Sequence, residues 1–498
     1  MFDCIQNRSG GVEYWQDNGL VGAVARCGMV TNLEREPWLP RLAEVFLQIP
    51  AMSFTRRQFL ASSALAVPFI LPSGLRAQGP SKKLAHAAIG IMGKGASDIE
   101  ALTEGGRVEV VAIADVDRRN HAEARQKFPR ATIYQDWREL FAKEGDRIDS
   151  VNVSVPDHLH APIALTALLR NKHVYCQKPL TRTVGEARAL RLAAAKAGVV
   201  TQMGNQIQSS SEYRTAARMI QEGAIGKVKE IHCWTGAQFP QAARPGGAAP
   251  VPEGLDWDQW LGVAPFRPYQ EAIYHPFQWR GWQDFGGGAI GDFGCHIMDT
   301  PFKALGLTAP LSVQCTGSEE AWLNTPERFQ DSWPAWETLR YEFPGSELTG
   351  GAALPVFWSD GGRKPEGAAL EVFQDRQIPP NGALFVGSEA SLMLVHYGGR
   401  PYLLPLEKDR AFRQPAVPGN PQEHYSSFVS ACLGEGKTTG GFDYAGQLAE
   451  ATLLGTIAVR HPGEKLLWDP GKLSFASHPS ATAKVKPEYR EGWKLAGI

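Results

Sequence analysis

Lys178, Asp292 and His296 are the side chains of this sequence best suited, by type and surroundings, to move protons. Lys178 follows an apolar stretch and precedes Pro179, and a proline disfavours the α region for the residue before it. The sequence therefore predicts Lys178 at the end of a strand, with its amine projecting. Ligands of open α/β sheets bind beyond the carboxyl ends of the strands, so this amine is expected at a binding site.

Asp292 and His296 lie four residues apart in a glycine-rich segment, 286–299. A helix opened by these glycines would place both side chains on one face. The histidine can take a proton from a hydroxyl near neutral pH, and a carboxylate one turn earlier can orient it or hold a substrate. A capping aspartate and a core histidine are the structural alternative for such a pair.

A strand, a glycine turn and a helix are predicted in that order from residue 84 onward. The turn carries Gly90, Gly93, Lys94 and Gly95. Backbone N–H groups at such a helix N-terminus let a pyrophosphate approach closely. Asp98 replaces the third glycine of the dinucleotide-binding pattern, so the glycines alone also fit an ordinary strand-to-helix loop.

The strand predicted at 108–114 ends at Asp115, about 20 residues past the glycines. An acid there accepts hydrogen bonds from ribose hydroxyls and repels a 2′-phosphate, which favours NAD over NADP. Arg118 and Arg119 lie close enough to keep NADP possible. Further strands are predicted at 150–155, 173–176 and 199–203, alternating with helices at 161–169 and 184–197. This alternation predicts a doubly wound parallel sheet, the Rossmann dinucleotide-binding domain, over residues 79–205.

The pattern changes beyond residue 205. Strand candidates lie at 229–234 and 311–315 among long Gly/Pro-rich connections, and helix candidates lie at 422–432 and 444–459. This pattern predicts an antiparallel sheet that forms one wall of a cleft, in a C-terminal substrate domain over residues 206–498.

The overall charge excludes some classes of partner. The 498 residues include 51 basic and 52 acidic side chains, a net charge of −1, so there is no electrostatic argument for nucleic acid or an anionic membrane surface. A neutral or weakly charged small substrate fits better. The seven cysteines lack the spacing of a zinc site or a disulfide framework, so buried thiols and no metal are expected.

Residues 52–78 have the features of a twin-arginine signal peptide. Phe54-Thr-Arg-Arg-Gln-Phe-Leu60 leads into an apolar run at 61–71 and a small-residue region near Ala77. The run is too short to span a bilayer as a stable helix, and a buried N-terminal helix with a chance Arg-Arg pair is the alternative. The sequence predicts export through the twin-arginine machinery to the periplasm or beyond, with a tightly bound cofactor acquired first. Residues 1–51 are an over-extended start or an unexplained extension.

Several short motifs together resemble the glucose-fructose oxidoreductase and inositol dehydrogenase (Gfo/Idh/MocA) family, in its exported branch. They lie at 90–95, 156–160, 178–179, 291–296, 358–362, 441–444 and 490–493. The resemblance covers roughly residues 84–493. It implies a Rossmann domain and a C-terminal α/β domain with a large, mostly antiparallel open sheet. That sheet often forms an oligomer interface in the family, so a homo-oligomer is expected.

The resemblance also assigns roles to individual residues. Lys178 matches the family's catalytic lysine, Asp292 its substrate-binding acid and His296 its general base. The implied cofactor contacts are Gly90, Gly93, Lys94, Gly95, Asp115, Pro156, His160, Gln177 and Lys178. Gln177 stands where the family has a glutamate, which removes a charge that would help to keep Lys178 protonated.

The implied activity is that of an NAD(P)-dependent oxidoreductase, which transfers a hydride between nicotinamide and a secondary alcohol of a sugar, cyclitol or glycoside. His275, Arg280 and Trp282 are candidate substrate contacts, with core packing as the alternative for Trp282. A redox-neutral NAD-dependent glycosidase or lyase, working by oxidation, elimination and re-reduction, is the second hypothesis. A non-catalytic sugar-binding protein is the third.

Overall fold

The computed structural model describes residues 4–5, 14–15, 83–374, 376–486 and 488–495. The chain divides into two units, residues 1–71 and 72–498. In the first unit, the described strands β1 (Cys4–Ile5) and β2 (Tyr14–Trp15) pair antiparallel. The predicted signal peptide at 52–78 and most of the predicted extension at 1–51 lie outside the described residues. No helix of the described part is both long and apolar enough to cross a membrane.

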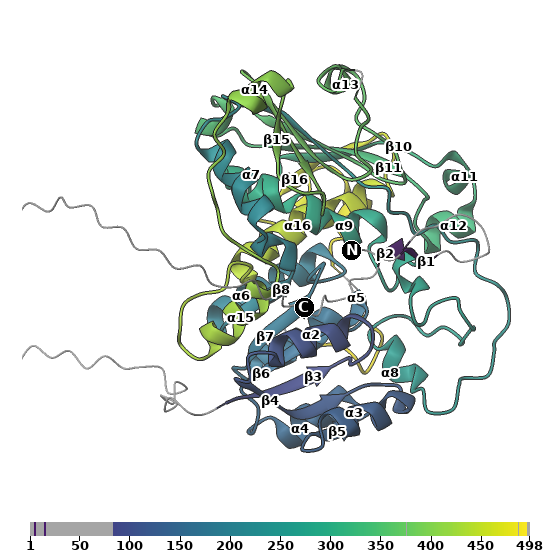
Figure 1. The fold of residues 1–498 in the computed structure, drawn as a ribbon. Coiled ribbons are helices and arrows are strands. Elements are labelled where there is room, and N and C mark those ends of the chain that lie inside the picture. Colours follow the sequence, from purple (N-terminus) through teal and green to yellow (C-terminus); the bar gives the residue numbers. More distant parts are fainter. Residues whose placement is uncertain (1–3, 6–13, 16–82, 375, 487, 496–498) are drawn as a thin grey trace, which may run out of the picture. The chain divides into compact units, whose positions relative to one another are not determined.

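The N-terminal domain of the second unit contains a six-stranded parallel sheet in the order β5-β4-β3-β6-β7-β8 (Figure 1). Its strands are β3 (Leu84–Ile89), β4 (Val108–Ala114), β5 (Thr132–Tyr134), β6 (Ser150–Val153), β7 (His173–Gln177) and β8 (Thr201–Gly204). The strand order reverses between β3 and β6, which is the Rossmann arrangement and places the ligand crevice at the carboxyl ends of these two strands.

Helices cover both faces of this sheet. They are α2 (Lys94–Thr103), α3 (His121–Lys127), α4 (Trp137–Glu144), α5 (Asp157–Leu169) and α6 (Val184–Ala197), with a 3-10 turn η2 (Arg118–Asn120). Apolar side chains of α2 and α3 form one buried cluster with β3 and β4, whereas those of α4, α5 and α6 belong to another. The sequence predicted α6 to the residue, but it missed β5, α3 and α4.

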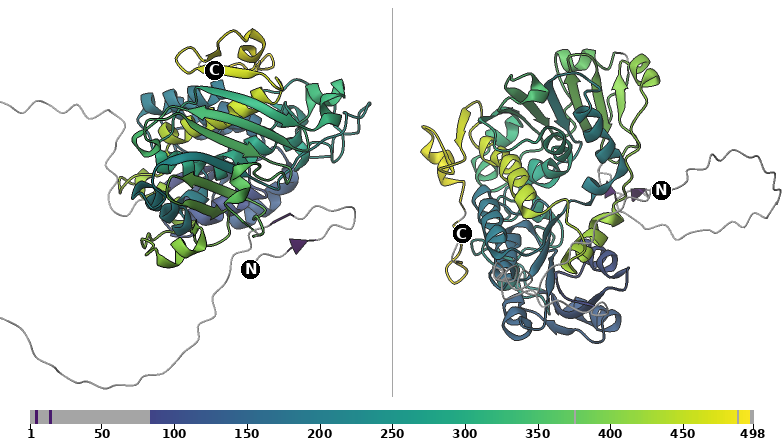
Figure 2. Two further views of the ribbon diagram at one scale, coloured as in Figure 1. Left: turned by 90° about the horizontal axis from the view of Figure 1, so that it is seen from above. Right: turned by 90° about the vertical axis from the view of Figure 1, so that its left-hand side faces the viewer.

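The C-terminal domain is built on a nine-stranded sheet in the order β15-β14-β13-β9-β12-β11-β10-β16-β17. Its strands are β9 (Val228–Trp234), β10 (Ser312–Ser318), β11 (Glu337–Phe343), β12 (Leu354–Ser359), β13 (Gly382–Gly387), β14 (Ser391–Val395), β15 (Tyr402–Leu404), β16 (Lys465–Asp469) and β17 (Ser474–Phe475). Among the described strand pairs of this sheet, only β9 and β12 are parallel. The predicted fold class is therefore confirmed. In the left view of Figure 2, the larger sheet is seen face-on.

Some helices of this domain lie on the side of the sheet that faces the Rossmann domain. Others are short and lie in the connections between strands. The longer ones are α7 (Ser211–Gln221), α9 (Gly288–Ile297), α10 (Asp299–Leu305), α15 (Gln422–Cys432) and α16 (Phe442–Ala458). The short ones are η3 (Gln206–Ser209), α8 (Trp257–Leu261), η4 (Gln278–Gly281), α11 (Glu320–Leu323), α12 (Pro326–Asp331), η5 (Glu347–Thr349), α13 (Ala368–Glu371), α14 (Leu406–Ala411) and α17 (Pro479–Ala483). The buried helix α16 packs against α6 and β8 and also against α9 and β10, so it joins the two domains (Figure 1).

Candidate active site

Lys178 follows β7 directly, and its side chain reaches across to α9. Its Nζ lies 3.0 Å from Asp292 Oδ1 and donates to the backbone oxygen of Asp292 at 3.0 Å. It also lies 5.7 Å from the centre of the Phe293 ring. The structure thus brings Lys178, at the carboxyl edge of the Rossmann sheet, onto the helix that carries Asp292 and His296.

The carboxylate of Asp292 is shared by two cations. Arg280 Nε donates to Asp292 Oδ1 at 3.2 Å, and its guanidinium stacks over the rings of Phe277 and Trp279. Burial opposes ionisation of Asp292, but Lys178 and Arg280 outweigh it and keep the pKa of this carboxyl below its usual value. Asp292 is therefore a buried carboxylate at neutral pH, and Arg280 belongs to the same cluster.

The imidazole of His296 is fixed in one tautomer by Asn205. Asn205 Nδ2 donates to the carbonyl of Cys295 at 2.8 Å, so Asn205 Oδ1 is left as an acceptor. His296 Nδ1 lies 2.6 Å from that oxygen and must donate to it. The neutral ring then carries its lone pair on Nε2, which is the atom available to take a proton.

His296 is held neutral by its surroundings. Burial lowers its pKa well below the usual value, and the charge of Lys178 acts in the same direction. His396, which follows β14, places its ring 5.5 Å from that of His296. Tyr213 of α7 contacts both histidines, because its hydroxyl lies 3.0 Å from the His296 carbonyl and 2.7 Å from His396 Nδ1.

Asp157, the first residue of α5, is a second buried carboxyl in this cluster. Burial and the nearby charge of Asp292 raise the pKa of Asp157 to about 8. It accepts a hydrogen bond from the backbone N–H of Gly287, just before α9. The two carboxyls therefore differ in state at neutral pH: Asp292 is ionised and Asp157 holds its proton.

The glycine turn after β3 fits a dinucleotide. A Cβ on Gly95 would lie 2.2 Å from Gly90 O, and a Cβ on Gly90 would lie 2.2 Å from Ser154 O, so neither position admits a side chain. Gly93 has a φ of 55°, and, apart from its chain neighbours, no atom of the described residues lies within 4 Å of the place where its Cβ would be. It precedes α2, which has no side-chain cap, so bare backbone faces open space where a pyrophosphate would bind.

Asp115 stands at the end of β4, beside this turn. Its carboxylate accepts from the N–H of Ile91 at 3.1 Å, the N–H of Asp117 at 2.9 Å and Asn120 Nδ2 at 3.1 Å. Burial nevertheless raises its pKa above the usual value. The position suits an acceptor for ribose hydroxyls and ties the acid to the backbone of the glycine turn.

Gln177 directs its side-chain amide onto Asp98. Gln177 Nε2 lies 2.9 and 2.8 Å from the two carboxylate oxygens of Asp98. Asp98 is fully buried and also accepts from Ser154 Oγ at 2.7 Å and Tyr425 OH at 2.9 Å. Lys94 Nζ lies 3.3 Å from the same carboxylate. Gln177 and Lys94 therefore hold a buried acid beneath the predicted cofactor site.

The other predicted contacts lie in different surroundings. Pro156 is the N-cap residue of α5. His160 is buried, and its Nε2 donates to Val155 O at 2.8 Å, so it stabilises the loop between β6 and α5. The ring of His275 lies edge-on to that of Trp260, with their centres 6.1 Å apart, and burial lowers the pKa of its imidazole.

Trp282 lies outside the cluster. It is 1% exposed, donates from Nε1 to Ile273 O and packs edge-on against Tyr274, with the Arg244 guanidinium 4.4 Å from its ring. No face of Trp282 is left for a sugar, so core packing, the alternative considered from the sequence, describes it.

Asn205, Asp157 and His396 were missed by the sequence reasoning. Asn205 lies two residues past the strand predicted at 199–203, and polar residues at that edge are candidates by position alone. Asp157 lies inside a segment already singled out, but nothing in the sequence shows that it is buried beside Asp292. His396 comes from the far end of the second sheet, and no spacing links it to His296. Within the described residues, no three His, Cys, Asp or Glu side chains are grouped to hold a metal ion.

Residues 85–205 match the Gfo/Idh/MocA family model described as "Oxidoreductase family, NAD-binding Rossmann fold". Residues 230–346 match the model of the same family described as "Oxidoreductase family, C-terminal alpha/beta domain". Levoglucosan dehydrogenase of Pseudarthrobacter phenanthrenivorans is 27% identical over 188 residues, which is 38% of this chain and 40% of that protein. Inositol 2-dehydrogenase of Rubrobacter xylanophilus is 29% identical over 161 residues, 32% of this chain and 45% of that protein. These alignments thus span less than half of the curated relatives.

Two solved structures show the same fold over most of their length. Levoglucosan dehydrogenase in complex with NADH and levoglucosan aligns with a TM-score of 0.50 at 19% identity, over 76% of this chain and 98% of that one. The WlbA dehydrogenase from Chromobactrium violaceum, in complex with NADH and UDP-GlcNAcA, aligns with a TM-score of 0.54 at 15% identity, over 80% of this chain and 99% of that one. With both family domains matched in order, the chain belongs to the Gfo/Idh/MocA oxidoreductase family and carries its NAD-binding Rossmann domain.

Proposed function

We propose that the protein is an NAD-dependent oxidoreductase that transfers a hydride between nicotinamide and a secondary alcohol of a sugar, cyclitol or glycoside. One observation carries the proposal: Lys178 Nζ, at the edge of the dinucleotide-binding sheet, lies 3.0 Å from Asp292 Oδ1 on the helix of His296. The names of the relatives, levoglucosan dehydrogenase and inositol 2-dehydrogenase, support an alcohol of this class.

The chain's own residues divide the work on the alcohol. Bound NAD⁺ supplies the hydride acceptor. His296 takes the hydroxyl proton on Nε2, since Asn205 keeps Nδ1 as a donor. Lys178 donates a hydrogen bond to the same oxygen and stabilises the negative charge that develops there. Asp292, kept ionised by Lys178 and Arg280, accepts from a neighbouring hydroxyl and orients the ring.

The direct test is the absorbance of purified, undialysed protein near the reduced-nicotinamide band during incubation with a panel of sugars and cyclitols. We expect at least one polyol to increase this band, and His296→Ala to abolish the increase while still binding NADH. A spectrum that neither added NAD⁺ nor any member of the panel changes would contradict the proposal.

A redox-neutral NAD-dependent glycosidase or lyase is the second candidate for the same residues. The signal-like pattern at 54–77 favours it, because free NAD(H) is scarce outside the cytoplasm and such a cycle consumes none. Aglycone release from glycosides without net NADH would select this candidate. Binding of sugars without NADH formation and without aglycone release would select the third hypothesis, a non-catalytic sugar-binding protein.

Export and self-association are further proposals. The twin-arginine pattern supports transport of the folded protein to the periplasm, and the large open sheet supports a homo-oligomer. Cell fractionation of the full chain and of Arg56→Lys/Arg57→Lys tests the first. Sedimentation of the purified protein tests the second.

A further inference from the structure

A cavity of about 210 Å³ lies at the N-terminal end of α6, and none of Lys178, Asp292 and His296 lines it. Its wall is formed by the start of α6, the end of α16, the segment before α9 and the C-terminal segment. Four cationic side chains line it: Arg182, Arg460, Lys484 and Lys486.

Among the described residues, the guanidinium groups of Arg182 and Arg460 have no acidic partner. Arg182 Nη1 donates to the carbonyl of Gln283 at 3.0 Å, and its Nε is buried without a partner among the described residues. Arg460 Nε donates to Thr456 O at 2.8 Å and its Nη1 to Gln283 Oε1 at 3.5 Å. Every hydrogen bond of these groups within the described part of the chain therefore goes to a neutral oxygen.

The carboxylates nearby are engaged elsewhere or exposed. Asp284 lines the cavity but pairs with Arg244 at 3.1 Å and Arg267 at 2.9 Å. Glu186 accepts from the N–H groups of Arg182 and Thr183 as the cap of α6. Glu488 is exposed at the rim. The cavity consequently carries an excess of positive charge.

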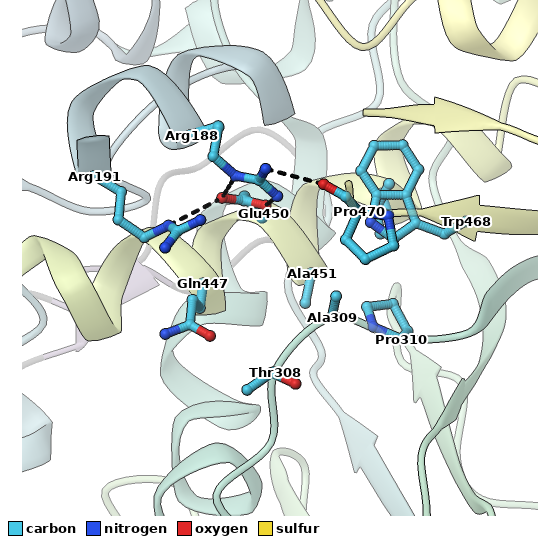
Figure 3. Close-up of a pocket in the computed structure, with 11 residues that line it drawn as sticks. Arg188, Arg191, Thr308, Ala309, Pro310, Gln447, Glu450, Ala451, Trp468 and Pro470 are labelled. Carbon is cyan, nitrogen blue, oxygen red and sulfur yellow. Dashed lines mark hydrogen bonds and ion pairs between the residues drawn. The ribbon is translucent and has the colours of Figure 1, made fainter. Parts of the chain in front are cut away.

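A second cavity, lined by other residues of α6 and α16, contains arginines that are paired with an acid. In Figure 3, Arg188 and Arg191 of α6 both point to Glu450 of α16. Arg188 Nε and Nη2 lie 2.7 and 2.6 Å from its carboxylate oxygens, and Arg191 Nε lies 3.5 Å away. The two helices thus neutralise one arginine pair internally. Arg182, just before α6, and Arg460, just after α16, have no such acid among the described residues.

Burial and mutual repulsion disfavour the charged forms of the cations in this cavity. Burial and the adjacent Arg182 lower the pKa of Arg460, and burial together with Arg460 lowers that of Lys484. Charges removed from water are stable only when they are paired, so a bound anion would relieve this repulsion. The planar forks of two arginines match the oxygens of a phosphate group.

We propose that this cavity is an anion site that binds a phosphate group, free or as part of a small phosphate monoester, between Arg182, Arg460 and Lys484. The site is separate from the proposed alcohol chemistry and does not depend on it.

The test is calorimetric titration of the full chain with inorganic phosphate, with ionic strength held constant by sodium chloride. We expect saturable binding with a Kd of about 1 mM or tighter. Arg182→Gln and Arg460→Gln should each weaken it about tenfold or more, since each removes a charge-assisted pair. The matched control is Arg130→Gln, whose 75% exposed side chain pairs with Glu109 on the Rossmann domain. No saturable binding by the wild type, or equal affinity in all four proteins, would overturn the proposal.

Two further measurements test the site even if Arg182→Gln or Arg460→Gln fails to fold. Lys484→Gln changes an exposed side chain and should weaken phosphate binding several-fold without loss of structure by circular dichroism. Glycerol phosphate distinguishes the two sources of the group: tighter binding than inorganic phosphate indicates a monoester site, and weaker binding indicates a free-phosphate site. Unchanged phosphate affinity in folded Lys484→Gln would reject the site.

Discussion

The side-chain amide of Gln177 donates to both carboxylate oxygens of Asp98, at 2.9 and 2.8 Å. The acid that the family pattern places at position 177 is thus absent, and an acid stands instead at position 98, where the dinucleotide pattern has glycine. A glutamate at 177 would face the buried Asp98 as a second carboxylate. The two departures from the pattern therefore lie in direct contact, and the amide at 177 gives the buried acid at 98 a neutral partner.

Gln177→Glu should lower the free energy of unfolding by about 1–3 kcal/mol, since it replaces a hydrogen bond by two like charges. Asp98→Asn combined with Gln177→Glu exchanges acid and amide and should recover most of this loss. Urea unfolding of the wild type, the two single variants and the double variant at neutral pH gives the coupling energy. Strictly additive effects of the two substitutions would show that the pair is independent.

Lys178→Ala should reduce kcat/KM by about 10²–10⁴-fold while leaving NADH binding in place, because the amine acts on the alcohol oxygen. NADH fluorescence and turnover of the same preparation separate the two effects. Lys143→Ala is the matched control, since Lys143 is 60% exposed and pairs with Glu139 on α4. Turnover of Lys178→Ala equal to that control would remove Lys178 from the mechanism.

Asn205→Asp should move the acidic limb of the pH profile for alcohol oxidation to higher pH. A carboxylate at His296 Nδ1 favours the protonated ring and so raises a pKa that burial and Lys178 now keep low. Oxidation needs neutral His296, so activity should be lost below the raised pKa. Asn205→Ala, which brings no charge, should lower kcat without this displacement. Identical limbs in wild type and Asn205→Asp would contradict the assigned tautomer.

Asp115→Ser should weaken NAD⁺ binding and improve NADP⁺ binding relative to it by about tenfold or more, because repulsion of the 2′-phosphate is removed. Quenching of protein fluorescence by each cofactor measures both constants. Asp146→Asn, an exposed acid on the same domain, is the control. An unchanged ratio of the two constants would place the ribose elsewhere.

Much of the fold followed from sequence because its signals are local. The glycine turn, Asp115 and the alternation of strands and helices lie within a short stretch of chain, and α6 has a complete capping box at Thr183 and Glu186. The position of Lys178 at a strand end follows from one strand and one proline. These features depend on neighbours a few residues away, which a linear reading can see.

The rest depends on contacts between distant segments. Asn205 acquires its role only because β8 ends beside α9, and His396 reaches His296 from the other sheet. Trp282 has the composition of a sugar contact, but its partners Tyr274 and Arg244 bury it. Burial of a particular polar group is a property of the packed chain, so residue type alone could not distinguish these cases.

Asp157 offers a test of the site through stability. In the unfolded chain its carboxyl has a pKa of about 3.9, whereas burial and Asp292 raise it to about 8 in the folded protein. Between these values the folded protein holds a proton that the unfolded chain has released. Stability therefore falls as pH rises from about 4 to about 8, and the full cost is present above that range.

Asp157→Asn cannot ionise and can still accept from the Gly287 N–H, so it should lack this part of the pH dependence. The difference in free energy of unfolding, wild type minus Asp157→Asn, should decline steadily across the window. Urea unfolding at several pH values measures it, with Asp146→Asn as the exposed control whose curve should stay parallel to the wild type. Parallel curves for Asp157→Asn as well would mean that Asp157 is ionised in the folded protein. The cluster around Lys178 would then hold two carboxylates rather than one carboxylate and one carboxylic acid.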